Sequence, residues 1–89
     1  METPINIIEN QLIELRRIVK YKGELCEAKI CMFLADIIDI EGSRTKEDDK
    51  ACTKIMTDRG IFKVRESYNR VKETWIYWIK SNREALNDE

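Results

Sequence analysis

The sequence has no histidine, one proline and three glycines among its 89 residues. Because histidine is the commonest general base, its absence excludes the usual catalytic triads and leaves the cysteines without a residue to activate them. The glycines are isolated at positions 23, 42 and 60, so they form no glycine-rich phosphate loop. We therefore expect a protein that is not an enzyme and binds no cofactor.

The sequence also lacks a cysteine framework and a long apolar run. Cys26, Cys31 and Cys52 are odd in number and match no zinc-binding spacing, which predicts reduced thiols and a cytoplasmic protein. The first two lie in an apolar segment where we expect them to act as small buried hydrophobes. The longest apolar run, residues 30–35, is far shorter than the roughly 20 residues of a membrane span. No signal peptide and no membrane contact are expected.

Acidic residues offer no convincing metal site. Glu24, Glu27, Asp36 and Asp39 would point in different directions from a single helix, so we predict no metal ligands among them. The net charge of −1 gives the chain as a whole no attraction to nucleic acid.

The apolar residues of the first half recur at helical spacing. The first series is Ile5, Ile8, Leu12, Leu15 and Val19, with intervals of three and four residues. Basic residues and Gly23 follow, as is typical of a helix end. This pattern predicts helices over about 4–21 and 24–41, with one continuous helix over 4–41 as the alternative. The isoleucines of the second segment also allow a β-strand, but its length and spacing favour a helix.

The second half shows a loop at 41–50 and two more helical patterns. We predict a short helix over about 46–58, ended by Gly60, and a long helix over about 62–86. Together these elements predict a single all-α domain over residues 1–89, a small bundle of three to four helices. A chain of this length has a thin core, so we expect homodimerisation to complete the bundle.

Five consecutive apolar residues, Trp75 to Ile79, lie in the middle of the last predicted helix. On a helical wheel Ile76 and Tyr77 fall outside the stripe that contains Trp75 and Trp78. This surplus surface has three interpretations: the chain's own core, a seam between identical subunits, or contact with another macromolecule. The residues assigned to a partner or oligomer interface are Tyr68, Trp75, Ile76, Tyr77 and Trp78.

Basic residues are enriched from Arg59 to Lys72, within a segment that has a helix–turn–helix outline. The spacing around its Gly60 is atypical and the following helix is long, which argues against this motif. The residues assigned to possible nucleic-acid contacts are Lys63, Arg65, Asn69, Arg70 and Lys72.

The sequence therefore predicts a small cytoplasmic, non-enzymatic helical module that binds proteins, as an adaptor or inhibitor. It would act through self-association and an aromatic and basic helix surface. Its size and lack of motifs are typical of accessory proteins of phages, viruses and mobile elements. The alternative is a DNA-binding transcriptional regulator resembling a helix–turn–helix protein.

Overall fold

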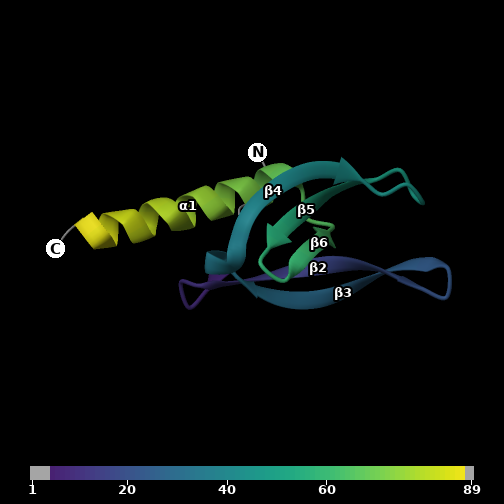
Figure 1. Cartoon of the computed structure of the whole chain (residues 1–89), viewed down its shortest axis with the longest axis horizontal. Coiled ribbons are helices and arrows are strands. Elements are labelled where there is room, and N and C mark those ends of the chain that lie inside the picture. The colour runs from purple at the N-terminus through teal and green to yellow at the C-terminus, as the bar shows by residue number, and fades with distance from the viewer. Residues whose placement is uncertain (1–4, 88–89) are drawn as a thin grey trace.

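The computed structural model describes residues 5–87, with side chains placed for residues 5–82. In this part of the chain, an antiparallel sheet curls into a half-barrel and one helix packs against it (Figure 1). The molecule is elongated, with principal extents of 52 × 29 × 19 Å. The predicted all-α bundle is therefore wrong, and so is the predicted function as a helical module.

Within residues 5–87, six strands and a short 3-10 helix precede the α-helix. They are β1 (Ile7–Ile8), β2 (Leu12–Tyr21), β3 (Glu24–Phe33), η1 (Leu34–Asp36), β4 (Ile37–Arg44), β5 (Ala51–Thr57), β6 (Gly60–Val64) and α1 (Tyr68–Asn87). β3 pairs with β2 over its whole length, so β1 and β6 lie along the other side of β2. β5 and β4 continue the sheet beyond β6. The long outer edges of the curled sheet are thus β3 and β4, and the two-residue β1 is also paired on one side only.

The predicted helices over 4–21 and 24–41 are wrong, because the first range contains β1 and β2 and the second contains β3, η1 and the first part of β4; residue 4 itself lies outside the described part. Side chains of β2 alternate between the two faces, with Ile13 and Leu15 buried and Glu14 exposed between them. Lys22 and Gly23 both have positive φ, 51° and 81°, as in the two-residue turns that close hairpins. The basic residues and glycine that suggest a helix end are in fact a β-turn.

The predicted helix over 46–58 is also wrong. Its second half forms β5, which pairs with β4 on one side and with β6 on the other. Thr57 pairs with Gly60 across a tight turn, so Gly60 begins a strand and does not end a helix. Because this turn links two strands that lie side by side in Figure 1, the segment has no helix–turn–helix geometry.

The last predicted helix exists but begins later than residue 62. Residues 60–64 form β6, and the helix starts at Tyr68. The Ser67 hydroxyl accepts a hydrogen bond from the Arg70 N–H (3.3 Å), which is the geometry of a helix N-cap. Ser67 is therefore the local signal that fixes the start of the helix.

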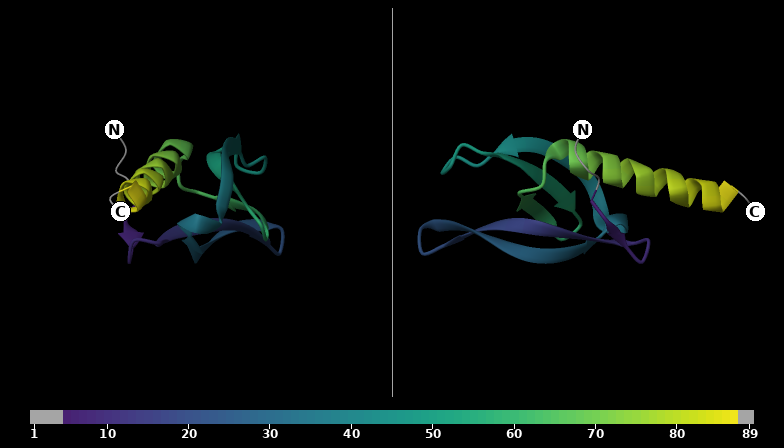
Figure 2. Two further views of the ribbon diagram at one scale, coloured as in Figure 1. Left: turned by 60° about the vertical axis from the view of Figure 1, so that its left-hand side comes forward. Right: turned by 180° about the vertical axis from the view of Figure 1, so that it is seen from behind.

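The core lies between the inner face of the sheet and α1. Its fully buried apolar side chains are Ile13, Leu15, Leu34, Ile55, Val64 and Val71. Thr74 joins the helix to the start of the described chain, because its hydroxyl accepts the Ile5 N–H (3.0 Å) and donates to the Arg70 carbonyl (2.8 Å). Figure 2 shows the first strand passing beside α1 in both views.

The cysteines are free, as predicted, but two of them are not buried. Cys26 and Cys31 are exposed on β3, whereas Cys52 is buried in β5. The expectation that Cys26 and Cys31 act as buried hydrophobes follows from the wrong helix assignment. Among the described residues, no helix has both the length and the apolar character needed to cross a membrane.

Candidate functional site

A groove runs between α1 and the first strand. Its larger part is a hollow of about 600 Å³, lined by Ile5, Asn6, Ile7, Asn10, Glu73, Thr74 and Tyr77. A second hollow of about 250 Å³ is lined by Ile7, Asn10, Tyr77, Trp78, Ser81 and Asn82. Three residues, Ile7, Asn10 and Tyr77, line both hollows, so we describe them together as the helix groove.

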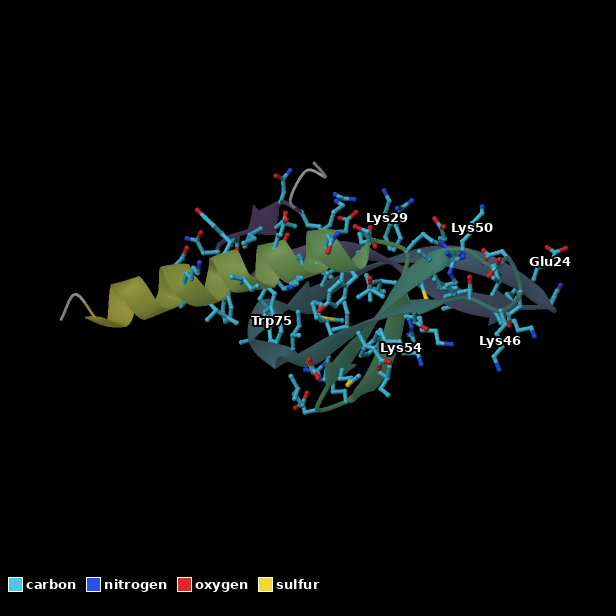
Figure 3. All side chains as sticks on the ribbon, turned by 90° about the horizontal axis from the view of Figure 1, so that it is seen from above. Glu24, Lys29, Lys46, Lys50, Lys54 and Trp75 are labelled. Carbon is cyan, nitrogen blue, oxygen red and sulfur yellow. The ribbon has the colours of Figure 1, made fainter. Side chains whose placement is uncertain are left out.

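The two walls of the helix groove are fixed to each other. The Trp78 indole N–H donates a hydrogen bond to the Asn10 carbonyl at 2.7 Å, which joins α1 to the turn after β1. Trp75 and Trp78 are partly buried and pack against the core. Figure 3 shows Trp75 on the side of α1 that faces the sheet. The groove is therefore preformed, which lowers the entropic cost of filling it.

The helix groove combines apolar walls with a few polar groups. Ile7 and Tyr77 supply apolar surface, and Tyr77 is 67% exposed. The side chains of Asn6 and Asn10 offer amide donors and acceptors, and Glu73 supplies a carboxylate. This mixture suits a polypeptide segment, which presents both apolar side chains and backbone hydrogen-bonding groups.

The residues predicted to form a partner interface have different environments. Trp75 and Trp78 anchor α1 to the sheet, while Ile76 and Tyr77 are exposed. Tyr68 begins the helix over Gly42, where an added Cβ atom would lie 3.7 Å from the tyrosine side chain. The structure thus places two of the five residues at the surface in mid-helix. Whether they contact a partner stays a prediction.

The residues predicted to contact nucleic acid do not share one element. Lys63 lies in β6, opposite Lys54 of β5. Asn69, Arg70 and Lys72 lie in the first two turns of α1, and the Lys72 ammonium lies 5.7 Å from the centre of the Tyr68 ring. The helix–turn–helix alternative is wrong because the residues preceding α1 form strands, so α1 has no partner helix in the described part.

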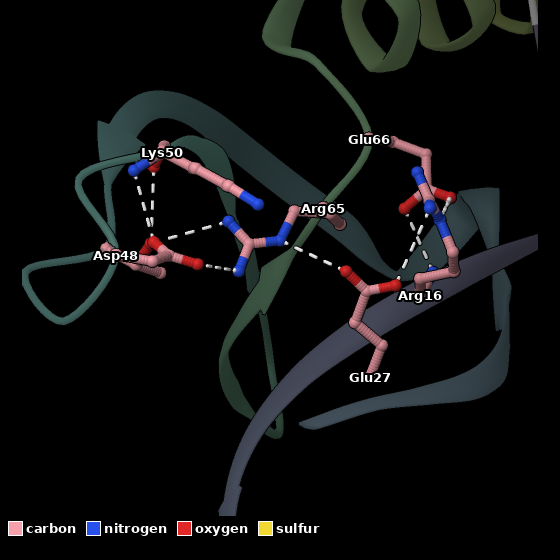
Figure 4. A network of polar contacts seen from close by, with 7 residues as sticks. Arg16, Glu27, Asp48, Lys50, Arg65 and Glu66 are labelled. Carbon is pink, nitrogen blue, oxygen red and sulfur yellow. Dashed lines mark hydrogen bonds and ion pairs between the residues drawn. The ribbon is translucent and has the colours of Figure 1, made fainter. Parts of the chain in front are cut away.

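Arg65, the remaining basic candidate, is the centre of an ion-pair network (Figure 4). Its guanidinium lies 2.6 Å from Asp48 of the β4–β5 loop and 3.3 Å from Glu27 of β3. The Arg65 side chain is 13% exposed. Two carboxylates therefore compensate its charge, so it is not available to bind phosphate.

Arg16 and Glu66 extend this network to β2 and the segment before α1. The Glu66 carboxylate accepts hydrogen bonds from the Arg16 backbone N–H (2.9 Å) and Nε–H (3.2 Å). Arg16 also lies 3.5 Å from Glu27. The network ties the β2–β3 hairpin, the β4–β5 loop and the linker to α1, and we infer a structural role. Sequence reasoning missed it because its members are far apart in the chain.

The surroundings of Asp48 lower the pKa of its carboxyl below the usual value. The Thr45 hydroxyl is the largest cause, followed among the stabilising contacts by the Lys50 backbone N–H and the Arg65 guanidinium; partial burial acts in the opposite direction. A carboxyl whose pKa is lowered by folding stabilises the fold above its unfolded pKa and loses this effect as the pH falls through its folded pKa.

We therefore expect Asp48→Asn to be less stable than the wild type at neutral pH. The difference should shrink as the pH falls below about 4, where the carboxyl becomes protonated in the unfolded chain and then in the folded one. Urea denaturation of both proteins between neutral and acidic pH measures this. Asp49→Asn is the matched control, because its side chain is almost fully exposed. A constant difference between the Asp48 variant and wild type at every pH would contradict the prediction.

Among the side chains placed in the structure, no three potential metal-binding groups converge. Of the acids considered from the sequence, Glu27 belongs to the Arg65 network and Asp36 lies 3.9 Å from Arg59. Glu24 lies beside the hairpin turn. Glu24 and Glu27 lie on β3, whereas Asp36 lies in η1.

Comparisons with known proteins give one partial match. No family model matches the chain, and no solved structure matches it. The chain is 37% identical over 87 residues to phosphoribosylformylglycinamidine synthase subunit PurL of Methanocaldococcus jannaschii. The match covers 85% of this chain but 11% of that protein, so the chain spans about a tenth of the length of this relative. This match indicates similarity to a small part of a large enzyme subunit.

Proposed function

We propose that this chain is a non-enzymatic β-domain that binds an extended segment of another protein in the helix groove. The observation that carries the proposal is the preformed groove with Tyr77 exposed on its wall. The occupant would place an apolar side chain against Tyr77 and a basic side chain near Glu73. Its backbone would form hydrogen bonds with the Asn6 and Asn10 amides.

The size and shape of the groove support a peptide as the ligand. Its larger hollow, about 600 Å³, can hold several side chains. Exposed tyrosines contribute strongly to protein interfaces because a large rigid ring contacts the partner at low entropic cost. The Thr74 hydroxyl is already used within the fold, so the amides of Asn6 and Asn10 and the Glu73 carboxylate remain to select the occupant.

The partial match to PurL is compatible with a binding role. A chain that spans 11% of a synthase subunit has too little of that protein to suggest the synthase reaction here. The relative is itself a subunit of a synthase. We also propose a cytoplasmic location, because the exposed thiols of Cys26 and Cys31 suit a reducing compartment.

The test is selection of peptides from a random phage-displayed library on the folded chain. We expect enriched peptides to contain an apolar residue and a lysine or arginine. Tyr77→Ala should weaken their binding about tenfold, the effect of losing an interface hot spot. Glu73→Gln should weaken peptides that carry the basic residue more than peptides that lack it. Fluorescence anisotropy of labelled peptides measures both effects.

Tyr21→Ala is the matched control. Tyr21 is a tyrosine of similar exposure, 63%, but it lies at the β2–β3 turn, away from the groove. Its substitution should leave peptide binding unchanged. A library that yields no peptide, or peptides that bind Tyr77→Ala as well as wild type, would contradict the proposed function.

A further inference from the structure

The two long outer edges of the sheet differ in how well they are protected from pairing with another strand. β4 has an irregular register between Ile37 and Asp39, and the Asp39 carboxylate occupies the backbone N–H of Ile40 at 2.8 Å. Glu41 adds a second exposed acid to β4. Bulges and charges of this kind are how proteins prevent edge strands from pairing.

β3 has no such irregularity, although it carries the exposed charges of Glu24, Glu27 and Lys29. It is a ten-residue strand that pairs with β2 without a register shift, from Glu24 to Phe33. It contains no proline, and most of its residues are exposed. A long, regular and exposed edge strand is a template for another strand. Figure 3 shows Lys29 of β3 and Lys54 of β5 on opposite long sides of the molecule, so the edge at Lys29 is separate from the β4–β5–β6 face.

The turn determines which backbone groups of β3 are available. Tyr21 and Glu24 flank a two-residue turn and so form a hydrogen-bonded pair, and such pairs alternate along an antiparallel ladder. Even-numbered residues of β3 therefore direct their backbone groups toward β2. The outward groups belong to Leu25, Glu27, Lys29, Cys31 and Phe33.

We propose that β3 pairs antiparallel with β3 of a second copy of this chain, centred on Ala28. In this register Ala28 lies opposite Ala28 of the second copy, and Glu27 lies opposite its Lys29. The symmetry repeats the Glu27–Lys29 pair. Glu27 already contacts Arg16 and Arg65 in its own chain, so Lys29 is the residue that gains an opposite charge in the dimer. This dimer uses residues other than the helix groove and does not depend on the proposed peptide binding.

The neighbouring registers are less favourable. Side chains alternate between the two faces of a strand, so the register can shift only in steps that keep side chains of the same face opposite each other. A shift by one step in either direction places Glu27 opposite its own copy or Lys29 opposite its own copy. Like charges directly opposite each other destabilise a sheet. The register centred on Ala28 avoids both contacts.

The environment of Lys29 within one chain also points to a partner. Its cross-strand neighbour on β2 is Arg16, which has the same charge. Lys29 takes part in none of the ion pairs found among the described residues. Glu27 of the second copy would supply the missing carboxylate. On the opposite face of β3, Cys26 would lie opposite Ile30 of the second copy. This pairing would give an apolar contact to the exposed Cys26 and the half-buried Ile30.

Two measurements on the full chain test the dimer. The first is molar mass by sedimentation equilibrium over a range of concentrations, for wild type, Lys29→Glu and Lys29→Ala. We expect wild type to form a dimer and Lys29→Glu to raise its dissociation constant about tenfold or more. The substitution places a glutamate opposite Glu27 of the other copy at both symmetry-related positions. Lys29→Ala should have a smaller effect. Circular dichroism and thermal melting should show that both variants keep the fold.

The second measurement is disulfide cross-linking at the symmetry axis. Ala28→Cys, in a chain with Cys26→Ser and Cys31→Ser, should form a covalent dimer on mild oxidation, since facing residues of a non-hydrogen-bonded pair lie within disulfide range. Leu25→Cys in the same background should not, because Leu25 lies opposite position 31 of the second copy and not opposite its own copy. A chain that remains monomeric at high concentration would overturn the proposal. So would a dimer that Lys29→Glu leaves intact and that Ala28→Cys fails to cross-link.

Discussion

Ile13→Ala should lower the free energy of unfolding by about 3 kcal/mol, the typical cost of truncating a fully buried aliphatic side chain. Ile13 is 0% exposed in β2, where it lies on the inner face of the sheet opposite Met32. Ile8→Ala should cost less than about 0.5 kcal/mol, because Ile8 is 41% exposed.

This pair of variants separates the observed strand from the predicted helix. The helical spacing of the sequence places Ile8 on the buried seam and Ile13 outside it, which would make Ile8→Ala the more harmful change. Urea denaturation of the two variants and wild type gives both free energies, with the slope of the transition checking that unfolding stays two-state. A greater loss of stability for Ile8→Ala than for Ile13→Ala would contradict the β2 assignment.

Arg65→Met should lower the free energy of unfolding by about 2 kcal/mol. Methionine keeps much of the side-chain volume but removes the positive charge between Asp48 and Glu27. Asp48 and Glu27 would then face each other without a cation, and the Thr45 hydroxyl would lose one of its neighbours. The cost is below that of a fully buried ion pair because water reaches both carboxylates.

Arg65→Lys is the matched control for this prediction. Lysine restores the charge but cannot bind both carboxylates through a planar fork, so it should recover part of the lost stability. Denaturation at low and high salt measures the electrostatic share, which should be largest for wild type. If Arg65→Met were as stable as wild type, the network would have no structural role.

The sequence was a good guide to α1, apart from its first residue, and a poor guide to everything before it. Two tryptophans, Val71 and the Ser67 cap produce an amphipathic helix whose length leaves little ambiguity. In β2, by contrast, the apolar residues occur in adjacent positions as well as alternate ones. Such a segment satisfies helical and strand spacing at once, and the choice depends on partners far away in the chain.

The turn signals were present but have two interpretations. Lys22 and Gly23 suit both a helix end and a two-residue hairpin turn, and a positive φ at the glycine is common to both. The antiparallel pairing of β2 with β3 on either side of the turn decides between them. The ion pairs of the Arg65 network had no comparable signal in the sequence. Arg65 and Glu27 are 38 positions apart, and nothing in the local sequence indicates that they pair.

The candidate site could be predicted only in part. Tyr77 was identified from its position outside the helical stripe, and it is exposed in the structure. The opposite wall of the helix groove, with Ile7 and Asn10, was missed because it belongs to a strand and turn that sequence reasoning assigned to a helix. A groove between two elements can be predicted only if the secondary structure of both elements is predicted correctly.

The contact between Ile5 and Thr74 joins positions 69 residues apart. During synthesis on the ribosome, this contact between the start of the described chain and the helix can therefore form only after most of the described chain has emerged. Closing so long a loop is entropically costly, and fold completion should be slower than for a protein with mostly local contacts. Until then the inner face of the β2–β3 hairpin remains open to water and to chaperones.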